Sequence, residues 1–87
     1  MKTFDELWLE LDRKIAAQDV ASNSVALINA GVHEIGKKIL EEAGEVWLAA
    51  EYQGQKELAL ELSQLLYYIQ VLAKARNISV EDIYREI

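Results

Sequence analysis

The chain has 87 residues, 52% of them hydrophobic, and its fifteen acidic and nine basic residues give a net charge of -6. This length predicts one domain over residues 1–87, and so much apolar material in a short chain indicates burial against a second copy. The acidic balance argues against binding to a nucleic-acid polymer. The absence of cysteine excludes a disulfide framework and thiolate metal sites.

The sequence shows no stretch with the pattern of a signal peptide or of a membrane span. The opening MKTFDELWLE places acids where a signal peptide needs an uninterrupted apolar stretch, and no run approaches the length of a membrane span. We therefore expect a cytoplasmic protein with no membrane partner. Frequent Ala, Leu, Glu and Lys, with no proline, predict an all-α fold.

Four helices are expected in chain order. The first opens at TFDE, where Thr3 and Glu6 form a capping-box pattern, and the polar segment 17–24 that follows it is expected to be a mobile loop. The second helix is expected at about residues 25–52, with a loosened point at Ala30-Gly31. The third is expected at about 55–76, after the break at Gly54. The last is expected at 80–87, where Ser79 and Asp82 form the capping pair. Short turns between four helices predict an up-down bundle.

The segment KKILEEAGEVW, residues 37–47, places a carboxylate among the apolar residues of its helix. At about 100° per residue, Glu42 lies about 20° from Ile35 on the core stripe, whereas Glu45 lies at the flank and Glu41 further round. The core stripe of the third helix is expected to comprise Leu58, Leu62, Leu65, Ile69 and Leu72, with Glu61 and Gln64 along its edge. A hairpin around Gly54 then brings Glu42, Glu45, Glu61 and Gln64 to similar heights.

Two interpretations fit these acids. An ionised carboxylate buried without a partner costs several kcal/mol, so a positive group must meet it. Lys38 can pair with one carboxylate, while Mg²⁺ or Mn²⁺ can serve all of them, because hard cations prefer oxygen ligands. The alternative is an ordinary solvated helix face whose glutamates pair with lysines.

The same residues resemble phosphoribosyl-ATP pyrophosphatase, the family that catalyses the second step of histidine biosynthesis and belongs to the all-α nucleotide pyrophosphohydrolases. The resemblance covers about Phe4 to Ile87. It rests on the serine-containing loop at Ser22 to Ser24, Gly31, the block Lys38-x-x-Glu41-Glu42-x-x-Glu45, Glu61 and the run Leu65-Leu66-Tyr67. It implies a dimeric helical bundle that hydrolyses phosphoribosyl-ATP to phosphoribosyl-AMP and pyrophosphate, with Mg²⁺ as cofactor.

Carried over by position, the resemblance also implies roles for individual residues. The implied metal ligands are Glu42, Glu45, Glu61 and, at the fourth motif position, Gln64. The implied catalytic residues are Glu41, Glu42 and Glu45. Of these, Glu41 would be a further ligand or would orient the attacking water. The implied substrate contacts are Lys38, Ser22 and Ser24. The E-x-x-D motif of the family reads Glu61-Leu-Ser-Gln64 here. A glutamine oxygen can still ligate a metal, but it brings no charge, which leaves the number of metal ions open.

Two other functions remain as alternatives at this point. One is a house-cleaning pyrophosphohydrolase of the same superfamily that acts on other nucleoside triphosphates. The other is a non-enzymatic helical dimerisation module whose acids are solvated.

Overall fold

The computed structural model describes residues 1–87 and contains five helices and no strand. The helices are α1 (Phe4–Ala17), α2 (Asn23–Ala30), α3 (Val32–Tyr52), α4 (Gln55–Ala75) and α5 (Val80–Arg85). The predicted all-α class is therefore confirmed. None of the helices combines the length and the apolar character needed to cross a membrane.

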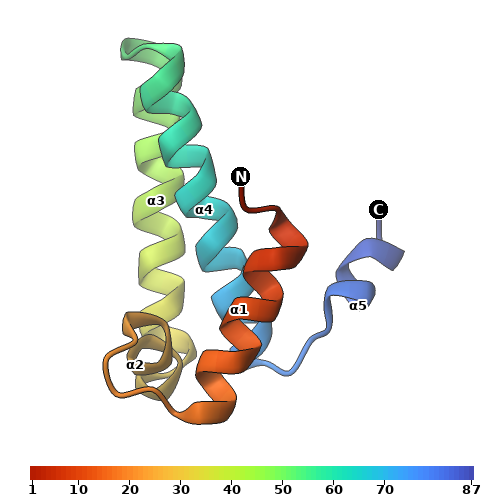
Figure 1. The fold of residues 1–87 in the computed structure, drawn as a ribbon. Coiled ribbons are helices and arrows are strands. Elements are labelled where there is room, and N and C mark those ends of the chain that lie inside the picture. The colour runs from red at the N-terminus through yellow and green to blue at the C-terminus, as the bar shows by residue number, and fades with distance from the viewer.

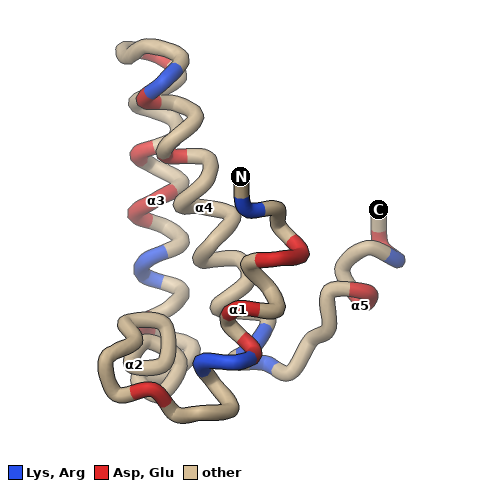
Figure 2. The backbone as a smooth tube through the Cα atoms, in the orientation of Figure 1, with Lys and Arg blue, Asp and Glu red and all other residues tan.

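A long antiparallel hairpin of α3 and α4 is the backbone of the fold (Figure 1). Helix α1 lies along the lower half of α4, and α2 contacts both hairpin helices near their lower end. Helix α5 follows an extended linker and contacts α1, where the Tyr84 hydroxyl donates to Asp5 Oδ1 at 2.6 Å. The turn end of the hairpin extends beyond the other helices, and acidic positions occur on both of its helices (Figure 2). The residues in this upper half therefore have no other helix of the chain to cover them.

Local side-chain bonds define the starts of the first and last helices. The Thr3 hydroxyl accepts the Glu6 N–H at 3.1 Å, and the Glu6 carboxylate accepts the Thr3 N–H at 3.1 Å. The same reciprocal pair joins Ser79 and Asp82 at 3.1 and 3.0 Å. Both predicted capping pairs are thus confirmed, because each satisfies backbone donors that a helix start leaves free.

The helix expected over residues 25–52 is divided at Gly31. Its backbone has φ 107° and ψ 171°, a conformation that residues with a side chain rarely adopt. Helix α2 ends at the preceding residue and α3 begins at the next one. The loosened point expected at Ala30-Gly31 is therefore a complete break, and the structure has five helices where the sequence predicted four.

Alanine substitutions at two glycines should change stability in opposite directions. Gly31→Ala should destabilise the protein by about 1 kcal/mol or more, because its positive φ strains any L side chain. Gly36→Ala should stabilise it by up to about 1 kcal/mol, because Gly36 lies within α3 and a Cβ there meets nothing within 4 Å. Urea denaturation at one fixed protein concentration measures both, and shifts of the same sign would contradict this account of the break.

The hydrophobic core lies in the lower half of the molecule, where α1, α3 and α4 meet. Leu11, Ile35 and Val71 are its fully buried members. The stripe expected on α4 is only partly covered, since its members Leu62 and Ile69 are 44% and 37% exposed, and the neighbouring Leu66 is 47% exposed. Only eleven of the 87 residues are buried, so much of the apolar surface is open in the single chain.

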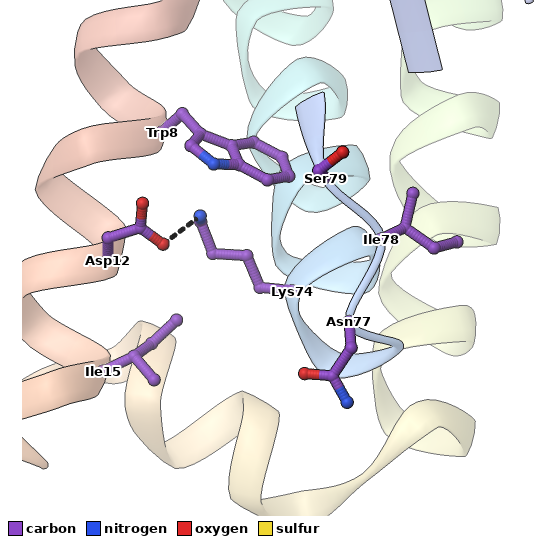
Figure 3. A pocket seen from close by; sticks show the side chains of 7 residues that line it. All are labelled: Trp8, Asp12, Ile15, Lys74, Asn77, Ile78 and Ser79. Atoms are coloured by element: carbon purple, nitrogen blue, oxygen red, sulfur yellow. Dashed lines mark hydrogen bonds and ion pairs between the residues drawn. The ribbon is translucent and has the colours of Figure 1, made fainter. Parts of the chain in front are cut away.

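A buried lysine joins α1 to the C-terminal end of α4 (Figure 3). The Lys74 side chain is 5% exposed, and its Nζ lies 2.6 Å from Asp12 Oδ1 and 3.5 Å from the centroid of a Trp8 ring. A buried cation is tolerated when an anion and an aromatic face compensate its lost hydration. This contact fixes α1 at the lower end of the hairpin and leaves the turn end open.

Candidate metal centre

Three carboxylates meet across the hairpin. Glu42 and Glu45 on α3 and Glu61 on α4 each offer one oxygen, and these three oxygens lie within 4.8 Å of one another. Glu42 is only 4% exposed, Glu61 is half-buried and Glu45 is exposed. We call these three residues the carboxylate cluster. The structure places it where helical spacing and the hairpin register predicted it.

No positive side chain of the protein compensates the cluster. None of the ion pairs in the structure involves its members, and the Oε2 atoms of Glu42 and Glu61 are buried without a hydrogen-bond partner. Buried polar atoms are nearly always paired, because an unpaired one loses its hydration without compensation. Converging carboxylate oxygens that receive no hydrogen bond are suitable ligands for a hard divalent cation such as Mg²⁺ or Mn²⁺.

Burial and the neighbouring carboxylates make Glu42 and Glu45 weaker acids. Burial raises the pKa of Glu42 to about 7, and the neighbouring Glu61 and Glu45 add to this increase. The pKa of Glu45 is also raised, first by the hydrogen bond that a protonated carboxyl shares with Glu61 and then by charge repulsion. Without a cation, the cluster therefore retains a proton at pH values where an isolated glutamate is fully ionised.

The metal-free protein should lose stability as the pH rises from 5 to 8. Folded Glu42 keeps its proton up to a pH of about 7, whereas its unfolded form releases the proton near 4.5. The folded state binds more protons between these values, so the free energy of unfolding falls across this window. We expect a loss of about 2 kcal/mol, after discounting for solvent at the cluster.

Urea denaturation in EDTA at pH 5 and pH 8 tests this expectation. Glu42→Gln removes the titrating group and should flatten most of the dependence on pH. The pKa values of Glu10 and Asp82 are lowered and act in the opposite sense, but only below the ordinary carboxyl pKa values of 4.5 for Glu10 and 3.8 for Asp82. A wild-type protein as insensitive to pH as Glu42→Gln would contradict the expectation.

Glu41, Lys38 and Gln64 lie outside the carboxylate cluster. The side chains of Lys38 and Glu41 are 49% and 65% exposed and pair with each other at 3.8 Å. Gln64 lies one helical turn beyond Glu61 and is exposed. The expected division of EEAGE is therefore seen, with Glu42 inward and Glu41 outward. The water-orienting, phosphate-contacting and metal-ligating roles of these three residues stay predictions.

Ser22 and Ser24 are both buried at the start of α2. The Ser22 hydroxyl accepts the Val25 N–H at 3.3 Å and caps the helix, while Ser24 Oγ lies 2.5 Å from the Tyr67 hydroxyl on α4. Part of the expected loop therefore belongs to α2 and attaches it to the hairpin. A phosphate or ribose contact by either serine stays a prediction.

A cleft of about 310 Å³ adjoins the cluster and contains residues that the sequence did not single out. It is lined by Glu45, Leu48, Gln53 and Glu61. Gln53 is the residue between α3 and the turn glycine, and no helical period marks a residue in a turn. Its position directly before Gly54 is the only feature of the sequence that could have identified it as a cleft residue.

Comparison with known protein families shows a match that covers nearly the whole chain. Residues 4–87 match the phosphoribosyl-ATP pyrophosphohydrolase family. The matched range contains all five helices, the carboxylate cluster and both serines at the start of α2. It coincides with the range over which the sequence resembles that family. The chain therefore belongs to the phosphoribosyl-ATP pyrophosphohydrolase family, whose members are hydrolases of histidine biosynthesis.

Proposed function

We propose that this protein hydrolyses phosphoribosyl-ATP to phosphoribosyl-AMP and pyrophosphate with a divalent cation held by the carboxylate cluster. The observation that supports this most strongly is the convergence of three carboxylates, two of which have buried oxygens without partners, in a chain of this family. A merely solvated helix face does not account for Glu42, which is 4% exposed. Mg²⁺ is the expected cation, and Mn²⁺ is an acceptable substitute for oxygen ligands.

The residues around the cleft suit direct hydrolysis by water. Glu42, Glu45 and Glu61 would hold the cation, with Gln64 as a further oxygen ligand. When bound, the cation supplies positive charge against the phosphates and lowers the pKa of a coordinated water. Glu45 or Glu41 would orient the attacking water and accept its proton. No serine, cysteine or histidine lines the cleft, so the chain offers no covalent nucleophile there.

The substrate preference is tested by rates of pyrophosphate release. Phosphoribosyl-ATP should be hydrolysed with a higher kcat/KM than any member of a panel of free nucleoside triphosphates, each assayed with Mg²⁺ at equal concentration. A preference for a free triphosphate would contradict the proposal. It would favour the house-cleaning alternative, which uses the same donor set.

We further propose that the protein functions as a homodimer through an exposed stripe on α4, formed by Leu62, Leu66 and Ile69. These side chains follow an i, i+4, i+7 spacing and lie on one face of the helix. Isolated apolar side chains on a surface are common, but a continuous stripe on a small chain with few buried residues is typical of an interface.

Two leucine substitutions on α4 distinguish the loss of a dimer interface from the general effect of placing a charge on the surface. Leu66→Glu should convert the dimer to a monomer, because a charge placed in an apolar interface is desolvated without a partner. Leu60→Glu is the matched control, since Leu60 is 54% exposed and lies on the opposite side of the same helix. Size-exclusion chromatography with light scattering gives the mass of each, and a dimeric Leu66→Glu variant would contradict the proposed interface.

A further inference from the structure

The cleft beside the carboxylate cluster has a definite direction along the hairpin. Its lining extends from Glu45 on α3 to Gln53, the first residue after that helix. The seven steps from Glu45 to Tyr52, at 1.5 Å each, place the end of α3 about 10 Å from Glu45 along the helix axis. Gln53 follows in extended backbone. Glu61 lines the cleft from α4, and Leu48 lies between Glu45 and Gln53 in the sequence. A ligand bound at the carboxylates that extends toward the turn therefore meets Gln53.

Gln53 has the only side chain with N–H donors among the residues that line this cleft. Its backbone is held in place, because its N–H donates to the Ala49 carbonyl at 3.0 Å and its φ of -124° and ψ of -177° are extended. No side chain or backbone atom of the protein makes a hydrogen bond to its carboxamide. The cleft thus contains one free donor group at a fixed position of the backbone.

The neutral charge of this donor suits its surroundings. A lysine in the same lining would carry a positive charge that attracts the carboxylates of Glu45 and Glu61 and competes with a cation for their oxygens. A carboxamide donates to phosphate oxygens without drawing the carboxylates away. The combination of two carboxylates and a neutral donor is therefore compatible with a metal-bound polyphosphate.

We propose that Gln53 is a substrate-binding residue that donates a hydrogen bond to the diphosphate portion of the substrate. This inference rests on the proposed function, because it assumes that a phosphoanhydride binds at the carboxylate cluster. It assigns a specific contact to the turn between α3 and α4, on the side of the cluster away from the hydrophobic core.

The test compares Gln53→Ala with Gln55→Ala, a matched control on the other side of Gly54. Both glutamines are exposed, but Gln55 does not line the cleft. Isothermal titration of inorganic pyrophosphate, with Mg²⁺ in excess, should show about ten-fold weaker binding for Gln53→Ala and wild-type binding for Gln55→Ala. Titration of Mg²⁺ alone should give the same affinity for both variants and wild type.

Kinetics with phosphoribosyl-ATP provide a second readout. Gln53→Ala should raise KM about ten-fold, and Gln53→Glu, which replaces the donor by a negative charge, should raise it at least as much. If Gln53→Ala matches Gln55→Ala in both experiments while the wild type is active, the role of Gln53 is overturned. If the wild type does not hydrolyse phosphoribosyl-ATP, the proposed function is overturned and the substrate assignment of Gln53 with it.

Discussion

Glu61→Gln should lower kcat for phosphoribosyl-ATP by on the order of 100-fold or more, while the protein remains folded. The substitution keeps the size of the side chain and removes one negative charge from the carboxylate cluster. The cluster then holds a divalent cation less tightly, and the charge stabilisation that the cation gives to phosphoryl transfer is worth several kcal/mol. Glu42→Gln should have an effect of similar size, because Glu42 supplies a buried oxygen of the same group.

The same two variants should be at least as stable as the wild type when metal is absent. Each removes a charge that repels its neighbours and has no protein partner. Glu51→Gln is the matched control for activity, since Glu51 is an exposed acid on α3 outside the cluster. Wild-type turnover by Glu61→Gln, with turnover of Glu51→Gln also unchanged, would contradict the proposed metal site. Such a result would fit acids that are simply solvated.

Removal of divalent cations should abolish pyrophosphate release, and addition of Mg²⁺ or Mn²⁺ should restore it. Mg²⁺ should also raise the Tm of the wild type by several °C, because a ligand that binds only the folded state stabilises it. This increase should be larger at pH 8 than at pH 5.5, since protons compete with the cation for Glu42 and Glu45. Differential scanning fluorimetry and a pyrophosphate-release assay measure the two effects.

Two results would contradict this metal dependence. One is full turnover in the presence of excess EDTA. The other is an equal rise in Tm for wild type and Glu61→Gln, which would place the bound cation elsewhere on the protein. Glu51→Gln again serves as the control that retains the cluster.

The fold was predictable from sequence where it depends on local interactions. The capping pairs Thr3–Glu6 and Ser79–Asp82 need only residues three positions apart, so their pattern fixes helix starts directly. The break at Gly31 was only partly predictable, because a glycine signals freedom of φ but not its sign. The composition indicated apolar surface that a second copy covers, but the residues of the open stripe on α4 were not predictable, because periodicity shows that a face is apolar and not whether it packs within the chain or outside it.

The candidate site was predictable where a residue conflicts with its surroundings. Glu42 interrupts an apolar stripe, which identified it as a buried charge, and the hairpin register then located Glu61. The bond between Ser24 and Tyr67 joins residues 43 positions apart and depends on how α2 packs on α4. Gln53 lies in a turn, where no period relates a side chain to a cleft.

The most direct test of the account is an equilibrium titration of Mn²⁺ followed by electron paramagnetic resonance, with wild type, Glu61→Gln and Glu51→Gln compared. Wild type and Glu51→Gln should bind Mn²⁺ with equal affinity, and Mg²⁺ should displace it. Glu61→Gln should bind it at least about ten-fold more weakly, because it has lost one of three converging carboxylates. Equal Mn²⁺ affinity in all three proteins would contradict the assignment of the carboxylate cluster as the metal centre.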